Sequence, residues 1–220
     1  MNTVSERVVK TPEGPARLIY NRGRRTAVTL VLGHGAGGGV DAWDLAVLAE
    51  ALPEYEVTVI RVEQPWRVAG RKIASPPDKL DKAWIAALNS MRTRTPLIVG
   101  GRSAGARVAC RTARSLGALG CLALAFPLRP PGRPDRSRAD ELRNTGVPTL
   151  VVQGERDAFG GPRNMPRGLR QQKVVAVPGA DHSFVVPRSA PVSQEEALTL
   201  IAESTLEWIA RTTGIELPQV

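Results

Sequence analysis

Short apolar runs alternate with amphipathic stretches along most of this chain. The runs are rich in β-branched residues and almost continuously apolar, as in strands that are buried on both faces. They cover Thr26–Leu32, Glu56–Val62, Leu97–Gly100, Cys121–Phe126, Thr149–Gln153 and Lys173–Val177. The amphipathic stretches predict helices over Trp43–Leu52, Asp78–Met91, Ala104–Leu116 and Ser193–Thr212. Strands and helices that alternate in this way predict an α/β fold, with a mostly parallel twisted sheet covered by helices on both faces.

The chain has 220 residues, 42% of them hydrophobic, which is enough for one globular core. We therefore expect a single domain over residues 1–220, with its core at about 15–213 and short flexible termini. Residues 1–10 are polar and lack the apolar segment of a signal peptide, and no run is long enough to span a membrane. These features predict a cytoplasmic protein.

One motif makes a specific chemical statement. Ser103 is the centre of Gly101-Arg102-Ser103-Ala104-Gly105, which follows a predicted strand and precedes a predicted helix. A Gly-x-Ser-x-Gly sequence in this setting is typical of a nucleophile elbow, a turn so tight that the residues two positions from the serine must be small. The serine hydroxyl is then exposed at the N-terminus of a helix.

A nucleophilic serine needs a base, and the base needs a group that orients it. The chain has two histidines, and only His182 follows Ser103, so His182 is the predicted base. In strand–helix hydrolases the acid lies between the two, after a strand. Asp157 is our choice, because it follows the strand that ends at Gln153. Glu155 and Asp181 remain alternatives.

The other histidine lies in a glycine-rich segment, Gly33–Gly39, directly after an early strand. In this architecture the oxyanion of the intermediate is held by one amide from such a loop and by the amide after the nucleophile. We therefore expect the amides of Ala36 and Ala104 to form the oxyanion hole. The predicted oxyanion loop also contains His34, Gly35 and Gly37. A nucleotide-binding loop is the alternative, but the segment lacks the Gly-Lys-Ser/Thr ending and a suitably placed acidic residue.

These motifs together resemble the small α/β-hydrolases related to dienelactone hydrolase, over roughly residues 15–210. The segments that carry the resemblance are Gly33–Gly37, Gly100–Arg107, Gln153–Gly160 and Gly179–Phe184. Arg102 in the elbow and Phe126-Pro127-Leu128 are similar to a subgroup of predicted bacterial hydrolases and animal proteins, one of them a subunit of a chromatin-modifying complex. The resemblance departs at two positions: the family often has glycine where Ala106 stands and a bulkier residue where Ala104 stands. It implies a fold and a triad but no particular substrate.

Larger hydrolases insert a lid before the strand at Thr149, whereas here about twenty residues intervene, with a short helix near Ser137–Arg143. We therefore expect no cap domain and an open, shallow site. The predicted pocket walls are aromatic, with core positions as the alternative for each; they are Trp43, Trp66, Phe126, Phe159 and Phe184. Arg102 and Arg67 are candidates for binding a substrate carboxylate, with solvated surface positions as the alternative.

The net charge of +9 comes from 25 arginines and 5 lysines. Basic proteins attract nucleic acid, but these arginines are scattered and few aromatic residues accompany them, which argues against that partner. Cys110 and Cys121 are expected to be buried thiols. No cluster has the spacing of a metal site, and the predicted chemistry needs no cofactor.

The sequence therefore predicts a serine hydrolase that acts on a small carboxylic ester, thioester or lactone through an acyl-enzyme on Ser103. The alternative is a hydrolase-fold scaffold that binds a protein partner with little turnover. The oligomeric state is not predicted.

Overall fold

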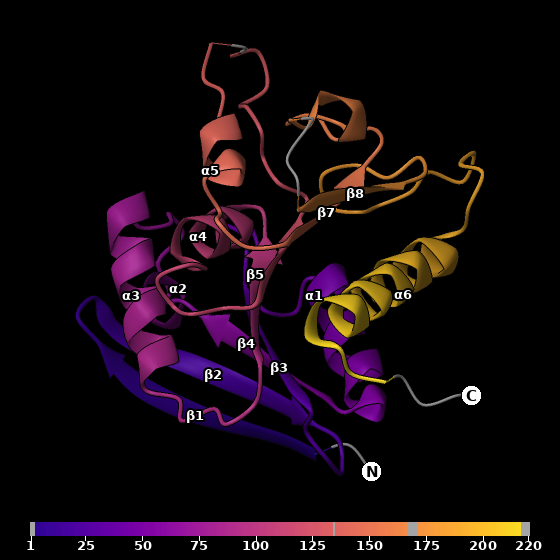
Figure 1. Ribbon diagram of the computed structural model, residues 1–220. Coiled ribbons are helices and arrows are strands. Elements are labelled where there is room, and N and C mark those ends of the chain that lie inside the picture. Colours follow the sequence, from indigo (N-terminus) through magenta and orange to yellow (C-terminus); the bar gives the residue numbers. More distant parts are fainter. Residues whose placement is uncertain (1–2, 134, 167–170, 217–220) are drawn as a thin grey trace.

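A computed structural model describes residues 3–133, 135–166 and 171–216 of the chain. Its described residues form one sheet of eight strands in the order β1-β2-β4-β3-β5-β6-β7-β8 (Figure 1). β1 and β2 are antiparallel to their neighbours, and all strands from β3 to β8 run parallel. The strands are β1 Thr3–Thr11, β2 Gly14–Arg22, β3 Val28–Gly33, β4 Val57–Glu63, β5 Leu97–Arg102, β6 Gly120–Leu124, β7 Thr149–Gly154 and β8 Gln172–Val177. The predicted mostly parallel α/β sheet is therefore confirmed.

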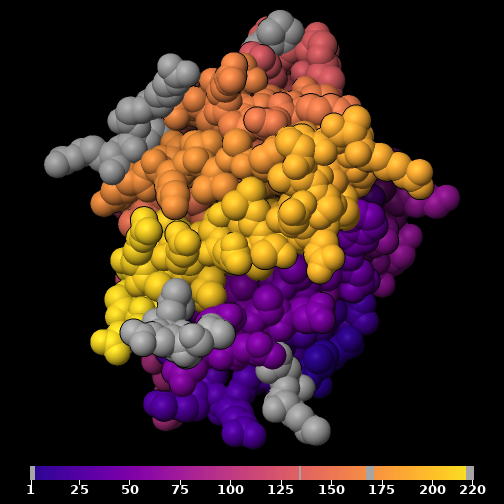
Figure 2. Space-filling view, turned by 90° about the vertical axis from the view of Figure 1, so that its right-hand side faces the viewer, coloured from indigo at the N-terminus to yellow at the C-terminus, as the bar shows by residue number. Residues whose placement is uncertain are grey.

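Helices cover both faces of this sheet. Figure 1 shows α2, α3 and α4 on one side and α1 and α6 on the other. The helices are α1 Trp43–Ala51, α2 Pro65–Val68, α3 Pro77–Asn89, α4 Ala104–Thr112, α5 Ala139–Arg143 and α6 Gln194–Thr213, with 3-10 turns at Leu52–Tyr55 and Pro162–Asn164. Figure 2 looks onto the second side, where α6, in yellow, crosses the surface between the purple and the orange parts of the chain.

Each face has its own apolar core, because the strand residues point alternately to the two sides. One core joins Trp84 of α3 and Val108 of α4 to the sheet. The other joins Leu48 of α1 and Ile201 of α6 to the opposite face. The central strands β3 and β6 are buried at every position, which explains their continuous apolar sequences.

The parallel strands place the loops that follow them at one edge of the sheet. The segments after β3, β5, β7 and β8 therefore meet there, although they are far apart in sequence. In the connection from β6 to β7, the part that the structure describes contains one short helix, α5. Within the described ranges, no cap domain covers this edge.

The N-terminal residues differ from the prediction. A flexible terminus was expected before residue 15, but β1 begins at Thr3 and pairs with β2 along its whole length. The apolar pattern missed β1 because it is an edge strand whose only buried residue is Val9. The helix after the elbow is also shorter than predicted and ends at Thr112.

Two further features concern the interior and the surface. The buried thiols of Cys110 on α4 and Cys121 on β6 lie 3.8 Å apart. Across the described ranges, no helix has the length and apolar character that a membrane span requires.

Candidate active site

Ser103 lies at a sharp bend between β5 and α4. Its backbone angles, φ 52° and ψ −110°, are rare for any residue with a side chain. The bend brings α4 against the end of β3: a Cβ on Gly105 would lie 2.3 Å from the carbonyl oxygen of Gly33, and one on Gly101 would lie 2.5 Å from it. The glycines on both sides of the serine are thus required by backbone contact. The hydroxyl of Ser103 is left half-buried at the start of α4.

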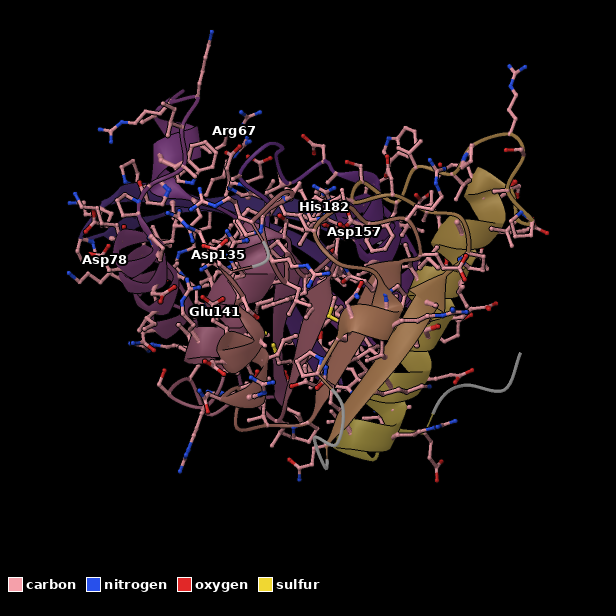
Figure 3. The ribbon with its side chains drawn as sticks, turned by 90° about the horizontal axis from the view of Figure 1, so that it is seen from above. Arg67, Asp78, Asp135, Glu141, Asp157 and His182 are labelled. Carbon is pink, nitrogen blue, oxygen red and sulfur yellow. The ribbon has the colours of Figure 1, made fainter. Side chains whose placement is uncertain are left out.

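Ser103, His182 and Asp157 form one chain of hydrogen bonds. Nε2 of His182 lies 3.0 Å from Oγ of Ser103, and Nδ1 of His182 lies 2.8 Å from Oδ2 of Asp157. The Asp157 side chain is fully buried, and the imidazole is one-fifth exposed. Figure 3, seen from above, shows the two labelled side chains next to each other over the ends of the central strands. This is the geometry in which an acid orients a base toward a nucleophile.

The two alternative acids are occupied elsewhere. Glu155 accepts a hydrogen bond from the backbone amide of Gly179. Asp181 accepts hydrogen bonds from the amides of Ser183 and Val185, so it stabilises the turn that contains His182. Neither carboxylate has a described hydrogen bond to the imidazole, which favours Asp157 as the orienting acid.

A buried glutamine that the sequence analysis missed holds Asp157 in place. Nε2 of Gln153 donates to Oδ2 of Asp157 at 2.7 Å and to the carbonyl oxygen of Gly160 at 2.8 Å. Its Oε1 accepts from the amide of Phe126 at 2.8 Å. Oδ1 of Asp157 also accepts from the amide of Phe159. The sequence does mark this glutamine: Gln153 is the polar residue that directly follows the uncharged strand positions Thr149 to Val152.

His34 anchors the glycine-rich loop after β3. Its Nε2 accepts a hydrogen bond from the amide of Gln64 at 3.1 Å, so the ring proton is on Nδ1, which lies 2.8 Å from the carbonyl oxygen of Gly35 and donates to it. The ring packs on Trp66, with centroids 5.5 Å apart. Burial lowers the pKa of His34, which keeps the ring neutral. The histidine therefore has a structural role in the loop and is separate from Ser103.

Ala36 and Ala104 line the same small crevice, so the loop after β3 meets the first residue of α4. The crevice is about 10 Å³, room for about one water molecule. Trp66 and Trp84 form part of its wall, and buried Nε1 of Trp84 has no described hydrogen-bond partner. Gly35 and the exposed Gly37 belong to the same loop.

The predicted aromatic walls divide between the site, the core and the surface. Phe159 lies over the imidazole of His182, with ring centroids 4.2 Å apart. Phe126 and Phe184 are fully buried members of the two cores, so they do not form pocket walls. Trp43 is 54% exposed.

Arg102 was expected to face a substrate or solvent, but its side chain is 10% exposed and turned inward. It donates from Nη2 to the carbonyl oxygen of His182 at 2.8 Å. Its Nε lies 3.3 Å from Oδ2 of Asp44, which is buried at the start of α1. The sequence analysis missed Asp44, since an acidic residue in the first turn of a helix is ordinary.

Comparisons with known proteins give the family and the fold of the chain. Residues 26–210 match the family described as an alpha/beta hydrolase domain. The fold is similar to the lid-less serine hydrolase XC6422 of Xanthomonas campestris, with a TM-score of 0.72, 22% identity, and coverage of 99% of this chain and 96% of that chain. It is also similar to a dienelactone hydrolase of Anabaena variabilis, with a TM-score of 0.72, 17% identity and coverage of 96% and 98%. An esterase of Thermogutta terrifontis gives a TM-score of 0.69, 17% identity and coverage of 95% and 99%. A search of curated proteins finds no significant match.

Proposed function

Because this chain belongs to the alpha/beta hydrolase domain family, we propose that it is a serine hydrolase that cleaves small carboxylic esters, or the related thioesters and lactones. The observation that carries the proposal is the hydrogen-bonded chain from Ser103 through His182 to Asp157. A scaffold without turnover has no need for a strained serine that is aligned with an imidazole.

In the acylation step, Oγ of Ser103 attacks the ester carbonyl carbon while Nε2 of His182 takes the hydroxyl proton. Asp157 keeps the Nδ1 proton in place and stabilises the imidazolium that forms. The carbonyl oxygen becomes an oxyanion, which the amides of Ala36 and Ala104 stabilise by hydrogen bonds. The intermediate then collapses, and the imidazolium donates its proton to the departing alcohol.

In the deacylation step, a water molecule loses its proton to His182 and attacks the acyl group on Ser103. The second tetrahedral intermediate releases the carboxylic acid, and Ser103 regains its proton from the imidazolium. The step needs water at the acyl group, and the partly exposed imidazole and the exposed Gly37 are consistent with an open approach.

A fluorophosphonate probe tests the assignment of the nucleophile. We expect labelling of the unaltered protein, and loss of labelling together with a fall in kcat of about 10⁴-fold or more in Ser103→Ala. Ser115→Ala, just past the end of α4, is the matched control and should label normally. Equal labelling of the unaltered protein and of Ser103→Ala, or no labelling of either, would reject Ser103 as the nucleophile and favour the scaffold.

A series of p-nitrophenyl esters tests the substrate class. In the part of the chain that the structure describes, no cap domain supplies a long apolar channel for an acyl chain, and the crevice beside Ala36 and Ala104 has room for about one water molecule. We therefore expect kcat/KM to be highest for acetyl and propionyl esters and to fall as the chain lengthens. A strong preference for long acyl chains would contradict the proposed substrate class while leaving the nucleophile intact.

A further inference from the structure

The Arg102 side chain contacts two separate parts of the candidate site and lies beside a third. Its Nη2 binds the backbone carbonyl of His182, and its Nε faces Asp44 on α1. Its Nη1 is 3.3 Å from the position that a Cβ on Gly35 would occupy, so the guanidinium also borders the oxyanion loop. The Arg102 guanidinium therefore lies next to the loop of His182, the predicted oxyanion loop and the start of α1.

The loop that contains His182 is held on both sides of the histidine by side chains: the amide of Gly179 donates to Glu155, and Gln194 donates to the carbonyl of Phe184. It connects β8 to α6 through turns, and its internal backbone hydrogen bonds are local, such as Asp181 N–H to Val185 O. Its described backbone bond to another loop is from Arg156 N–H to Ala180 O. The carbonyl of His182 itself is bonded to the residue that directly precedes Ser103. The Arg102 side chain therefore links the backbone of the proposed base, His182, to the residue next to the proposed nucleophile, Ser103.

Asp44 is the buried counter-ion of Arg102, and its burial disfavours the charged carboxylate. It is 1% exposed, and burial raises its pKa to about 6, against the opposing effects of Arg102 and of the helix amides of Asp44 and Leu45. A buried ion pair is often no more stabilising than an apolar pair of the same volume. The pair is therefore better explained by what it holds in place than by its contribution to stability.

We propose that Arg102 is a positioning residue that couples the nucleophile elbow to the loop of the base, with Asp44 as its buried counter-ion. This inference rests on the proposed hydrolase function for its kinetic consequence, but not for its structural one. The guanidinium suits the task because its charge is spread over one plane: Nη2 donates to the carbonyl of His182, while Nε lies 3.3 Å from Asp44 and forms an ion pair with it without a hydrogen bond. An ammonium is a compact point charge and does not reproduce that planar fork.

The test uses three variants of the full chain. Asp44→Asn/Arg102→Met removes both charges together, so that neither is left buried alone. Arg102→Lys keeps the charge and loses the planar fork. Arg111→Lys is the matched control, because Arg111 lies in the last turn of α4, the helix that follows the elbow, and pairs bidentately with Asp81 of α3.

We expect kcat for a short ester to fall about 10- to 100-fold in the double variant with KM within about twofold, because the base is displaced from the nucleophile. The kcat of Arg102→Lys should lie between those of the double variant and the unaltered protein. The kcat of Arg111→Lys should match that of the unaltered protein. Equal kcat in the double variant and the unaltered protein would overturn the inference. If the double variant does not fold, Arg102→Lys decides, and an unchanged kcat overturns it.

A second readout does not depend on turnover. The chain has only two histidines, so the imidazole resonances of His182 and His34 can be separated by NMR, and His34 serves as the internal reference. We expect the Nδ1–H signal of His182 to weaken or shift in the double variant while that of His34 stays. An unchanged His182 signal overturns the inference even if the protein hydrolyses no ester. Loss of the signal in a protein that no fluorophosphonate labels supports the inference and rejects the proposed function.

Discussion

The backbone strain at Ser103 can be measured by comparing two variants that both lack the hydroxyl. With φ 52° and ψ −110°, a residue with a Cβ is held in a region that costs about 1–3 kcal/mol, whereas glycine enters it freely. Ser103→Ala keeps the Cβ and therefore the strain. Ser103→Gly removes the strain but makes the unfolded chain more flexible, which costs about 0.4–1 kcal/mol.

The difference between these effects favours glycine by about 1 kcal/mol. For a chain of 150–250 residues this corresponds to a rise in Tm of about 2–4 °C for Ser103→Gly over Ser103→Ala. Both variants lose the hydrogen bond to His182, so that contribution cancels. The assay is urea unfolding, with thermal melts in parallel.

A matched pair at Ser115 provides the control. Ser115 donates a hydrogen bond to the carbonyl of Thr112, and its φ is not among the positive values of the chain. There the order should reverse, with Ser115→Ala more stable than Ser115→Gly by about 0.4–1 kcal/mol. If Ser103→Gly proves less stable than Ser103→Ala, the elbow is not strained and the reasoning fails.

Three further predictions follow from contacts around the site. Gln153→Leu should lower the free energy of unfolding by about 2 kcal/mol or more, since it leaves the buried amide of Phe126 and the buried carbonyl of Gly160 without a partner, whereas the carbonyl of Phe126 keeps its bond from the amide of Leu128. It should also lower kcat, because Asp157 loses the bond from Gln153; unchanged urea unfolding would contradict this. Gly105→Ala should be severely destabilised or insoluble, because its methyl group would overlap the backbone of Gly33. Gly37→Ala is the control: no atom lies within 4 Å of the new carbon, so this variant should melt like the unaltered protein. Equal melting temperatures of the two variants would rule out the close contact. The raised pKa of Asp44, about 6 against 3.8, means that the folded state binds more protons than the unfolded state between these values, so this group makes the protein less stable by about 2 kcal/mol as pH rises from 4 to 7. Asp44→Asn should remove that decline, and a stability difference between the two proteins that does not change with pH would refute the assignment.

Much of the fold was readable from the apolar pattern. Each of the central strands is buried on both faces, so its sequence is continuously apolar and its position is clear. β1 escaped because only Val9 is buried, and an edge strand of mixed polarity has no periodicity to detect. The end of α4 was overestimated because helix-forming residues continue after Thr112 into a turn.

The residues of the candidate site also differ in how well the sequence predicts them. Ser103, Asp157 and His182 could be proposed from the sequence because each follows a strand, and parallel strands bring their ends to one edge of the sheet. The roles of Gln153 and Asp44 were not, since each depends on which side chain faces it across the fold. Arg102 was assigned to substrate or solvent because nothing local indicates whether an arginine points inward. Phe126 and Phe184 were ambiguous between wall and core for the same reason.

The neighbouring buried thiols of Cys110 and Cys121 can report how often α4 separates from β6. The neighbouring thiol of Cys110 and burial raise the pKa of Cys121 well above its ordinary value, so Cys121 offers almost no thiolate to a reagent in the intact protein. A thiol-reactive dye can therefore reach these atoms only after α4 has separated from β6. The rate of dye uptake under native conditions would then measure how often the scaffold behind the serine comes apart, without any denaturant and without an engineered probe.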